Sequence, residues 1–393
     1  MEKREKKNLA AMAFVMDSVM AFSFAFFPTY LFSETSYKLF ALSRVLVQLL
    51  CLIATLPKVA KKLTPAHWLL AISPLIPLIS TIAMGNSNQI SFGIQIFLAY
   101  LTIISYATYR SERDYLGYTK NTSIVMGSLL LLNAVTMFIF RDTTMVGRKN
   151  FYFLGNDNAT IFETVIFILY SSISTLKTRK NMPLSLYLTY CIILAAYIFT
   201  WSGNALIATM ALIVTILFRN TKVLRLVSTK KNLLIFCIAF FMLFIVQHTE
   251  NSLAGGVLNA LGKDYTYTGR TIIWDKMWPY IEKNPLIGNG YEDTEVAVAK
   301  FRFNKAHNAI IQTLYTGGVL QLLLILSSLY LSIKKYEKND QNKAQYTILI
   351  AATMVFFIVN SFDYDFARYS IPYLALLFMN ANRLDYDKSK AKK

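Results

Sequence analysis

The sequence is poor in the residues from which proteins build disulfides and zinc sites. Its 393 residues include 3 cysteines and 3 histidines. Cys51, Cys191 and Cys237 each stand alone within an apolar run, so their spacing predicts neither a disulfide nor a metal site, and they are interpreted as small buried residues. Charged residues make up only 16% of the chain, which is too few for an ordinary soluble domain of this length.

Hydrophobic residues, in contrast, make up 55% of the chain, and the mean hydropathy is +0.42. The formal net charge is +18, but the basic residues lie in short segments between long apolar runs, so we expect no nucleic-acid partner. The amino-terminal run resembles a signal peptide at first. It continues to about Phe32 without a small-residue cleavage site, so we interpret it as a retained membrane span.

Apolar stretches long enough to cross a bilayer recur along the whole chain. They predict a single integral membrane domain over residues 1–393, an all-α polytopic protein of about twelve transmembrane helices. The predicted spans are 9–32, 38–57, 66–84, 89–109, 122–140, 159–176, 183–200, 204–218, 232–247, 308–333, 345–361 and 369–382.

The distribution of basic residues between these spans predicts the orientation of the chain. If the amino terminus is cytoplasmic, the inner segments hold 27 of the 40 lysines and arginines and the outer segments hold 11. Cytoplasmic loops carry an excess of lysine and arginine in membrane proteins. We therefore expect both termini in the cytoplasm.

Two outer segments are longer than the other connections. One covers 141–158, and the other covers 248–307 between the ninth and tenth spans. Long loops in a compact fold are usually functional. Within the longer one, an apolar pattern recurs at helical spacing and predicts an amphipathic helix along the outer surface; its members are Ile273, Met277, Tyr280 and Ile281. We expect its tryptophans, Trp274 and Trp278, to anchor it among lipid headgroups.

The motifs of the longer segment follow one another in a characteristic order. GRTIIWDKMWPYIEKNPLIGNGY is followed by KAHNAIIQTLYTGGV, and GRKNFYFLGNDNATIFE precedes both. Over residues 269–333 this order resembles the O-antigen ligase and polymerase superfamily of bacterial enzymes. The resemblance implies a fold like that of C-type glycosyltransferases, with an outward-facing cavity under the long extracytoplasmic loop. It also implies a place in the bacterial cytoplasmic membrane with the active site on the outer side.

The resemblance implies transfer of a glycan from undecaprenyl pyrophosphate to a hydroxyl. Arg148 and Arg270 match the family's motifs, and a guanidinium binds phosphate oxygens in a bidentate manner, so both are expected at the pyrophosphate. His307 is the expected catalytic base, with Asn308 orienting the sugar or the imidazole. Each residue also has a structural interpretation, as a headgroup-facing cation or a surface or capping side chain. Gly317–Gly318 would let a helix or the polyprenyl chain approach closely.

Further polar residues near the predicted spans are candidates for substrate contacts. Asn156 and Asn158 are first of all helix-capping residues, with sugar binding as the alternative. Arg44 either faces a cavity and binds pyrophosphate or extends to the interface. Asp363, Asp365 and Arg368 form either a local ion pair or part of the acceptor site. Asp17 and Glu163 are buried by this topology and could each pair with an arginine.

The chain departs from the family pattern at one turn. Family members often carry a Ser-Arg pair between two mid-chain spans, whereas this chain has Ser202–Gly203. Arg44 or Arg141 would have to replace the missing cation. The outer loops hold no carboxylate cluster of the kind that binds Mg²⁺ or Mn²⁺, so we expect no metal and no cofactor.

The resulting prediction is a polymerase that passes a growing capsule, exopolysaccharide or O-antigen chain to the non-reducing end of the next lipid-linked repeat unit. Its expected partners are those undecaprenyl-pyrophosphate-linked units, membrane lipids, a flippase and a chain-length regulator. One alternative is a ligase that transfers the glycan to another acceptor. The other, of a different class, is a lipid-linked oligosaccharide flippase, against which the long outer loop and the lack of a repeat between the two halves both argue.

Overall fold

The computed structural model describes residues 2–25, 34–142, 150–179, 181–242, 269–336 and 343–362. Nearly all of these residues are helical. The helices are α1 (Glu2–Ala25), α2 (Glu34–Val59), α3 (Pro65–Ile72), α4 (Leu75–Ala83), α5 (Ile90–Ile139), α6 (Ile161–Thr178), α7 (Leu184–Thr200), α8 (Gly203–Phe218), α9 (Lys222–Val227), α10 (Lys230–Phe241), α12 (Arg270–Lys283), α13 (Thr294–Phe301), α14 (Ala309–Tyr336) and α15 (Lys343–Phe362). A short antiparallel hairpin has two strands of two residues each, β1 (Phe151–Tyr152) and β2 (Gly155–Asn156). The described chain also contains two short 3₁₀ helices, Ala60–Lys62 and Ser87–Gln89.

The observed helices follow the apolar runs closely, and the protein is an all-α polytopic membrane protein. Seven helical stretches are long and apolar enough to cross a membrane by length and composition, within the ranges that the structure describes. One of them, Ser87–Ile139, covers two predicted spans, and α7 and α8 are shorter apolar helices. The span predicted at 369–382 lies outside the described residues, so the total of twelve remains a prediction.

One predicted span and one predicted loop differ from the observed structure, each for a local reason. The span predicted at 66–84 is divided into α3 and α4 around Ser73 and Pro74, because proline has no backbone N–H to continue a helix. The loop predicted at 110–121 is instead a kink within α5. Asp114 leaves the helical region with φ −158°, and its carboxylate accepts a hydrogen bond of 2.8 Å from the N–H of Gly117.

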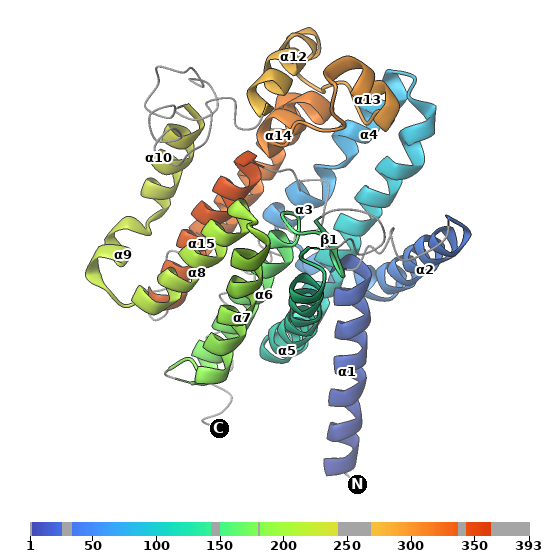
Figure 1. Ribbon diagram of the computed structural model, residues 1–393. Helices are drawn as coiled ribbons and strands as arrows, with labels where there is room; N and C mark the ends of the chain where they lie inside the picture. Colours follow the sequence, from blue (N-terminus) through green and yellow to red (C-terminus); the bar gives the residue numbers. More distant parts are fainter. Residues whose placement is uncertain are drawn as a thin grey trace.

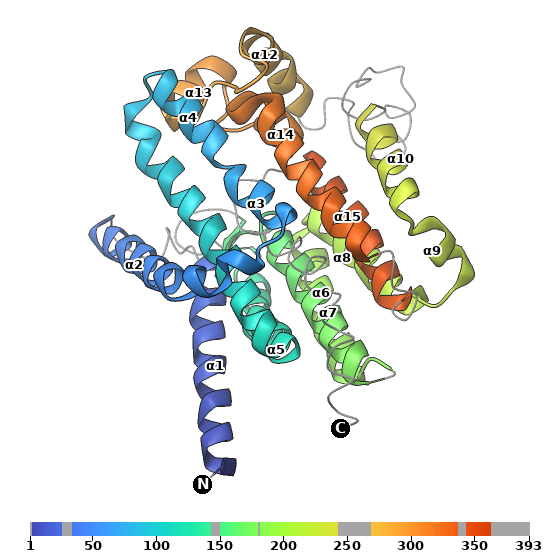
Figure 2. The ribbon, with the colours of Figure 1, turned by 180° about the vertical axis from the view of Figure 1, so that it is seen from behind.

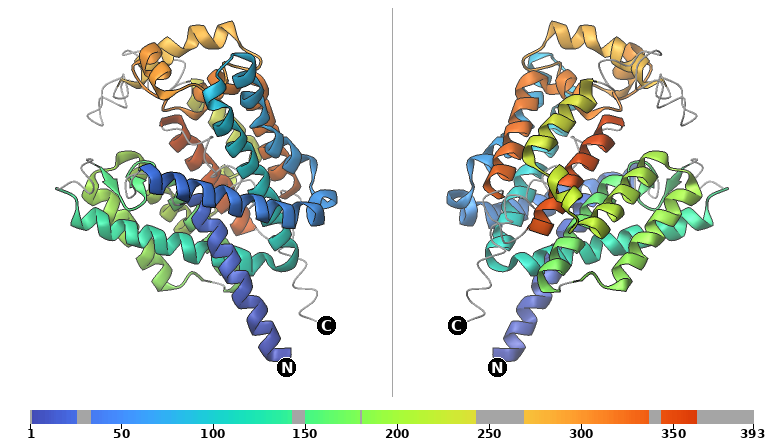
Figure 3. Two further views of the ribbon diagram at one scale, coloured as in Figure 1. Left: turned by 90° about the vertical axis from the view of Figure 1, so that its right-hand side faces the viewer. Right: turned by 90° about the vertical axis from the view of Figure 1, so that its left-hand side faces the viewer.

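The two ends of the helical bundle are formed by different elements (Figure 1). α12 and α13 lie at one end, together with the turn between α4 and α5. The amino terminus and the connection between α6 and α7 lie at the opposite end (Figures 1 and 2). α14 packs against α3 and α4 on one side and contacts α15, which packs against α8 and α10. In the views turned by 90°, α12 and α13 again lie at one extreme, away from α6 and α7 (Figure 3).

A buried ion pair fixes α1 against α5. The Asp17 carboxylate accepts bonds of 2.8 and 2.9 Å from Nε and Nη2 of Arg110, 2.6 Å from the Tyr106 hydroxyl and 2.8 Å from the Asn121 amide. Asp17 is 1% exposed. The prediction that Asp17 pairs with an arginine is confirmed, whereas the corresponding prediction for Glu163 stays a prediction. A buried carboxylate with four donors is compensated for its loss of hydration.

Candidate functional site

We call the end of the protein with α12 and α13 the outer end, after the orientation that the sequence predicts. It is built on α12, which presents one face to a separate hydrophobic core. Ile273, Met277 and Ile281 are buried, as their spacing predicts, and they pack with residues of α13 and α14. Trp274 belongs to the same core with 2% exposure, so the prediction that it anchors among headgroups is wrong. Its indole N–H donates a 2.9 Å hydrogen bond to the carbonyl of Ala306. This bond joins the second turn of α12 to the segment before α14.

Arg270 and His307 therefore belong to elements that meet at this bond. Arg270 is the first residue of α12 and lies one turn before Trp274, after Gly269 with φ 83°. His307 follows Ala306 directly and is half-buried with φ 49°, in the left-handed region. A residue other than glycine in that region needs support from its surroundings, and such positions are frequent at functional sites.

The neighbours of His307 supply that support. The N–H of Ala306 donates to Oε1 of Gln312 at 2.7 Å. Asn308 is fully buried; its Oδ1 accepts from the N–H groups of Ile310 and Ile311 at 2.9 and 3.0 Å, so it caps α14. Its Nδ2 donates to the Ser361 carbonyl of α15 at 3.0 Å. Asn308 thus has a structural position in the described contacts, and its role toward sugar or imidazole stays a prediction.

α14 is broken near its outer end, where Gly318 has φ 63° and ψ −168°. The break leaves backbone groups on both sides without helical partners, and the segment 285–290 binds them. The N–H groups of Asn289 and Gly290 donate to the carbonyls of Tyr315 and Thr316 at 2.7 and 2.9 Å. On the other side of the break, Val319 and Leu320 donate to the carbonyls of residues 285 and 286 at 2.8 and 3.1 Å. We call residues 285–290 the inserted segment.

The inserted segment approaches α14 so closely that glycine is required on both sides. A Cβ on Gly288 would lie 2.6 Å from the backbone nitrogen of Gly317, and one on Gly318 would lie 2.6 Å from that of Ile287. The sequence predicted close approach at Gly317–Gly318 by a helix or a polyprenyl chain. The close approach is present, but the partner is the protein's own backbone. Broken helices inside membrane proteins are tolerated where protein groups satisfy the freed backbone in this way.

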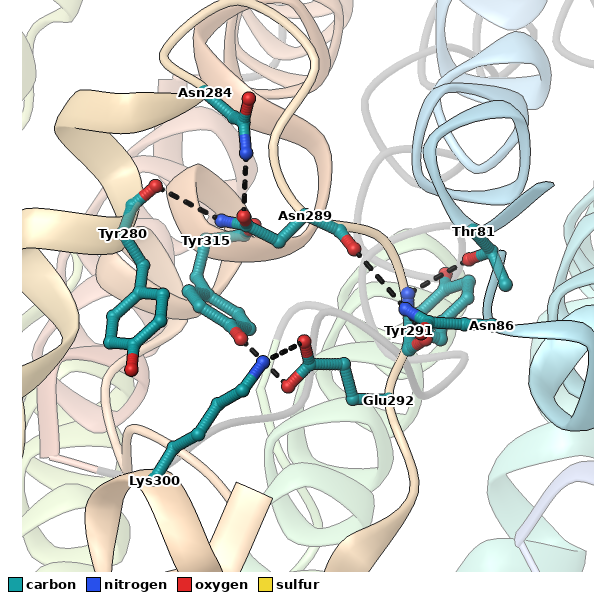
Figure 4. Close-up of polar contacts among 9 residues, drawn as sticks. All are labelled: Thr81, Asn86, Tyr280, Asn284, Asn289, Tyr291, Glu292, Lys300 and Tyr315. Carbon is teal, nitrogen blue, oxygen red and sulfur yellow. Dashed lines mark hydrogen bonds and ion pairs between the residues drawn. The ribbon is translucent and has the colours of Figure 1, made fainter. Parts of the chain in front are cut away.

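Asn289 ties the inserted segment to both α12 and α14 (Figure 4). Its Nδ2 donates to the carbonyls of Tyr280 and Tyr315 at 3.1 and 3.3 Å, and its Oδ1 accepts from the amide of Asn284 at 2.8 Å. The side chain is 8% exposed. Asn289 therefore fixes the last turns of α12, the helix that begins at Arg270, against the helix that follows His307.

The other edge of the inserted segment is bound to α4 and the turn after it. The Ser80 hydroxyl donates to the carbonyl of Ile287. The N–H of Tyr291 donates to the Thr81 hydroxyl at 2.8 Å, and the amide of Asn86 donates to the Tyr291 carbonyl at 3.1 Å (Figure 4). The inserted segment and Tyr291 thus join α4 to α12 and α14, which lie far from α4 in the sequence.

A buried carboxylate joins α13 to α14 next to this junction. Glu292 accepts 2.7 Å from the Tyr315 hydroxyl and pairs with Nζ of Lys300 at 2.5 Å (Figure 4). The Lys300 ammonium lies 5.3 Å from the centre of the Tyr280 ring. No local pattern in the sequence distinguishes Glu292, because the partners of a carboxylate on an irregular segment depend on tertiary contacts.

An apolar cavity of about 820 Å³ extends from this end of the protein along α10, α14 and α15. Trp278 and Ile310 line it near the outer end, and Ser361, whose carbonyl binds Asn308, also contributes. Along its length the wall is almost entirely aliphatic and aromatic. The cavity therefore begins one turn beyond His307, since Ile310 is three residues further along the chain.

A second group of outer residues lies around the β1–β2 hairpin and the turn between α7 and α8. Asn158 accepts 2.9 Å from the Ser202 hydroxyl, and Asn156 accepts 3.1 Å from the N–H of Asn158. Neither asparagine is the N-cap of α6, which is Thr160. Asp157 between them is 2% exposed, and burial raises the pKa of its carboxyl to about 6. Whether these asparagines bind sugar stays a prediction.

Arg141 reaches the turn that lacks the expected arginine. Its guanidinium lies 4.5 Å from the centre of the Phe199 ring, three residues before Ser202. Arg44 is 8% exposed and lines a different cavity of about 360 Å³ between α1, α2 and the second part of α5. Of the two cations that could replace the missing one, Arg141 is thus the one at this turn.

The structure brings together the elements that carry Arg270, His307 and Asn308, and it places Arg44 elsewhere. The hairpin with Asn156 and Asn158 also lies apart from α12, at mid-height in Figure 1. The remaining predicted site residues, Arg148, Asp363 and Arg368, lie outside the described residues.

Residues 153–326 match the family model described as O-Antigen ligase. The matched range includes Asn156, Asn158 and the turn at Ser202. It also includes α12, α13 and the break in α14. No curated protein matches the chain. Members of this family are glycosyltransferase-like enzymes, which indicates glycan transfer of the O-antigen ligase or polymerase type. Over residues 153–326 the chain is thus similar to the O-antigen ligase family, which is consistent with the O-antigen ligase and polymerase superfamily.

Proposed function

We propose that the protein is a polysaccharide polymerase that transfers a growing glycan from undecaprenyl pyrophosphate to the non-reducing-end hydroxyl of a lipid-linked repeat unit. The observation that supports it best is the apolar cavity that begins beside the His307 turn. A polyprenyl chain needs an apolar path, and its pyrophosphate needs cations at the end of that path. The lining of the cavity suits a polyprenyl chain. Trp278 of α12 lines the cavity near its outer end, and Arg270 is the first residue of the same helix.

The proposed chemistry uses groups that the fold holds in place. As the bond from the sugar to pyrophosphate breaks, negative charge grows on the leaving oxygen, and the Arg270 guanidinium stabilises it. The acceptor hydroxyl loses its proton to a neutral imidazole of His307 as it attacks the anomeric carbon. Arg148, which lies outside the described residues, is the proposed second cation. The reaction requires no metal in this proposal.

The test is polymerisation by the purified protein in nanodiscs, supplied with a synthetic undecaprenyl-pyrophosphate repeat unit. We expect a ladder of products from the wild type and a loss of at least a hundredfold in rate for Arg270→Ala and His307→Ala, the range for a removed charge stabiliser or general base. Lys283→Ala is the matched control, because it removes an exposed cation from the last turn of the same helix. It should keep the wild-type rate.

Other outcomes would contradict the proposal in different ways. Transfer of a single glycan to an added acceptor, with no ladder, would indicate a ligase. Movement of the lipid-linked unit across the bilayer without any new glycosidic bond would indicate a flippase. Full activity of the folded His307→Ala variant would remove His307 from the mechanism.

A further inference from the structure

A second cavity, of about 750 Å³, lies in a part of the protein that the proposed transfer reaction does not use. It is a groove between α5, α6 and α7. On α5 its lining runs from Leu116 to Leu131, a distance of about 22 Å along the helix. Its lining includes Arg179 and Pro183 in the connection between α6 and α7. That connection lies at the end of the protein opposite α12 and α13 (Figure 1).

The groove has a charged end and an apolar end. Lys120 and Arg179 are exposed and line it near the start of the α5 segment and the end of α6. Phe167 lies at the other end, because a Cβ on Gly127 would be 2.6 Å from its ring, which fixes how α5 and α6 are aligned. Leu131 continues the apolar part. The described residues that line the groove include no carboxylate to neutralise the two cations.

Three of the serines between the two ends have hydroxyl hydrogens that are already bonded. Ser123, Ser171 and Ser174 donate to carbonyls of their own helices at 2.8, 2.6 and 3.1 Å. Such internal bonds leave small side chains without a donor that needs water, so a hydrocarbon chain can lie against them. The groove is therefore suited to a molecule with an anionic head and an apolar chain.

We propose that this groove binds an anionic glycerophospholipid, with its phosphate at Lys120 and Arg179 and an acyl chain along α5 toward Leu131. The positive-inside orientation places the charged end in the cytoplasmic leaflet, where basic pockets between transmembrane helices bind anionic headgroups. This proposal concerns a site distant from α12 and does not depend on the transfer reaction. The lipid would hold α6 and α7 against α5.

The experiment measures binding of phosphatidylglycerol to the delipidated full-length protein in detergent by native mass spectrometry, with phosphatidylcholine as the zwitterionic comparison. We expect one tightly retained phosphatidylglycerol. The double variant Lys120→Gln/Arg179→Gln should bind it about thirtyfold more weakly, from two cations near the membrane surface. Ser128→Phe keeps both cations and fills the groove, so it should also lose the lipid. Melting curves of each variant establish that it is folded.

The control is Lys222→Gln/Arg225→Gln, which removes two exposed cations from α9, outside the groove. Its affinity should equal that of the wild type. An equal loss in this control, or equal retention of phosphatidylcholine, would overturn the proposal in favour of unspecific attraction. Displacement of the lipid by millimolar inorganic phosphate, together with unchanged binding to Ser128→Phe, would show a site for a free anion instead of a lipid.

Discussion

Replacement of Gly318 by alanine should destabilise the protein far more than its size suggests. Gly318 has φ 63° and ψ −168°, a region that essentially only glycine adopts, so alanine there costs about 1–3 kcal/mol in strain. The new Cβ would also collide with the backbone of Leu286 and Ile287. If the inserted segment moves away, the bonds from Val319 and Leu320 are lost, at about 1 kcal/mol each. The total is about 3–5 kcal/mol.

This cost should appear as a fall in the melting temperature, on the order of 6–10 °C, measured by circular dichroism of the purified protein in detergent. Gly203→Ala is the matched control. Gly203 lies in the first turn of α8 with no atom within 4 Å of a built Cβ, so alanine should leave the melting temperature unchanged or raise it slightly. Equal melting temperatures for the wild type and Gly318→Ala would refute the role assigned to the break in α14.

Three further predictions concern single polar side chains. Asp17→Asn should lower stability by about 3–5 kcal/mol, because it leaves the buried Arg110 without a counter-charge; thermal melting of the single variant measures this. Asn289→Ala should cost about 2–3 kcal/mol because it removes the three hydrogen bonds of a buried side-chain amide, whereas Asn284→Ala, which removes one partner of Asn289, should cost less than half as much. Asp157 should make stability depend on pH: since burial raises the pKa of its carboxyl in the folded protein to about 6, above the ordinary value of 3.8, the folded state binds the extra proton, and about 2–3 kcal/mol is lost as pH rises from 4 to 6. Melting of Asp157→Asn over the same pH range should lack that slope.

The sequence predicted the helices well because hydrophobic runs of membrane length are a local property. The bounds of α2, α6, α7 and α8 lie within a few residues of the predicted spans. The kink at Asp114 was missed because the charged residues around it resemble a cytoplasmic loop, although the backbone on both sides is helical. Local composition thus locates a span, but it does not decide whether a charged stretch ends a helix or bends it.

The candidate site was less predictable because most of its order depends on contacts distant in sequence. The turn Gly288–Asn289–Gly290 and the pair Gly317–Gly318 are recognisable in the sequence as rich in glycine. Nothing local indicates that the two segments bind each other. Likewise Trp274 has the sequence environment of an interfacial anchor, and only its packing in one core with residues of α13 and α14 makes it a buried residue. Asn289 offered only its position between two glycines as a signal, which is typical of a turn rather than of a buried junction.

The arrangement separates residues that hold the outer end together from the residues to which the proposed function assigns chemistry. Gly318 and Asn289 act through backbone bonds at the break in α14, so their variants should first lose stability, and any loss of transfer should follow from that. Arg270 and His307 begin or precede helices whose ends are fixed by Asn289 and Asn308, so their variants should lose transfer while the melting temperature stays near that of the wild type. If His307→Ala instead melted as early as Gly318→Ala, the left-handed turn would be a structural element, and the base for the acceptor hydroxyl would have to be sought elsewhere.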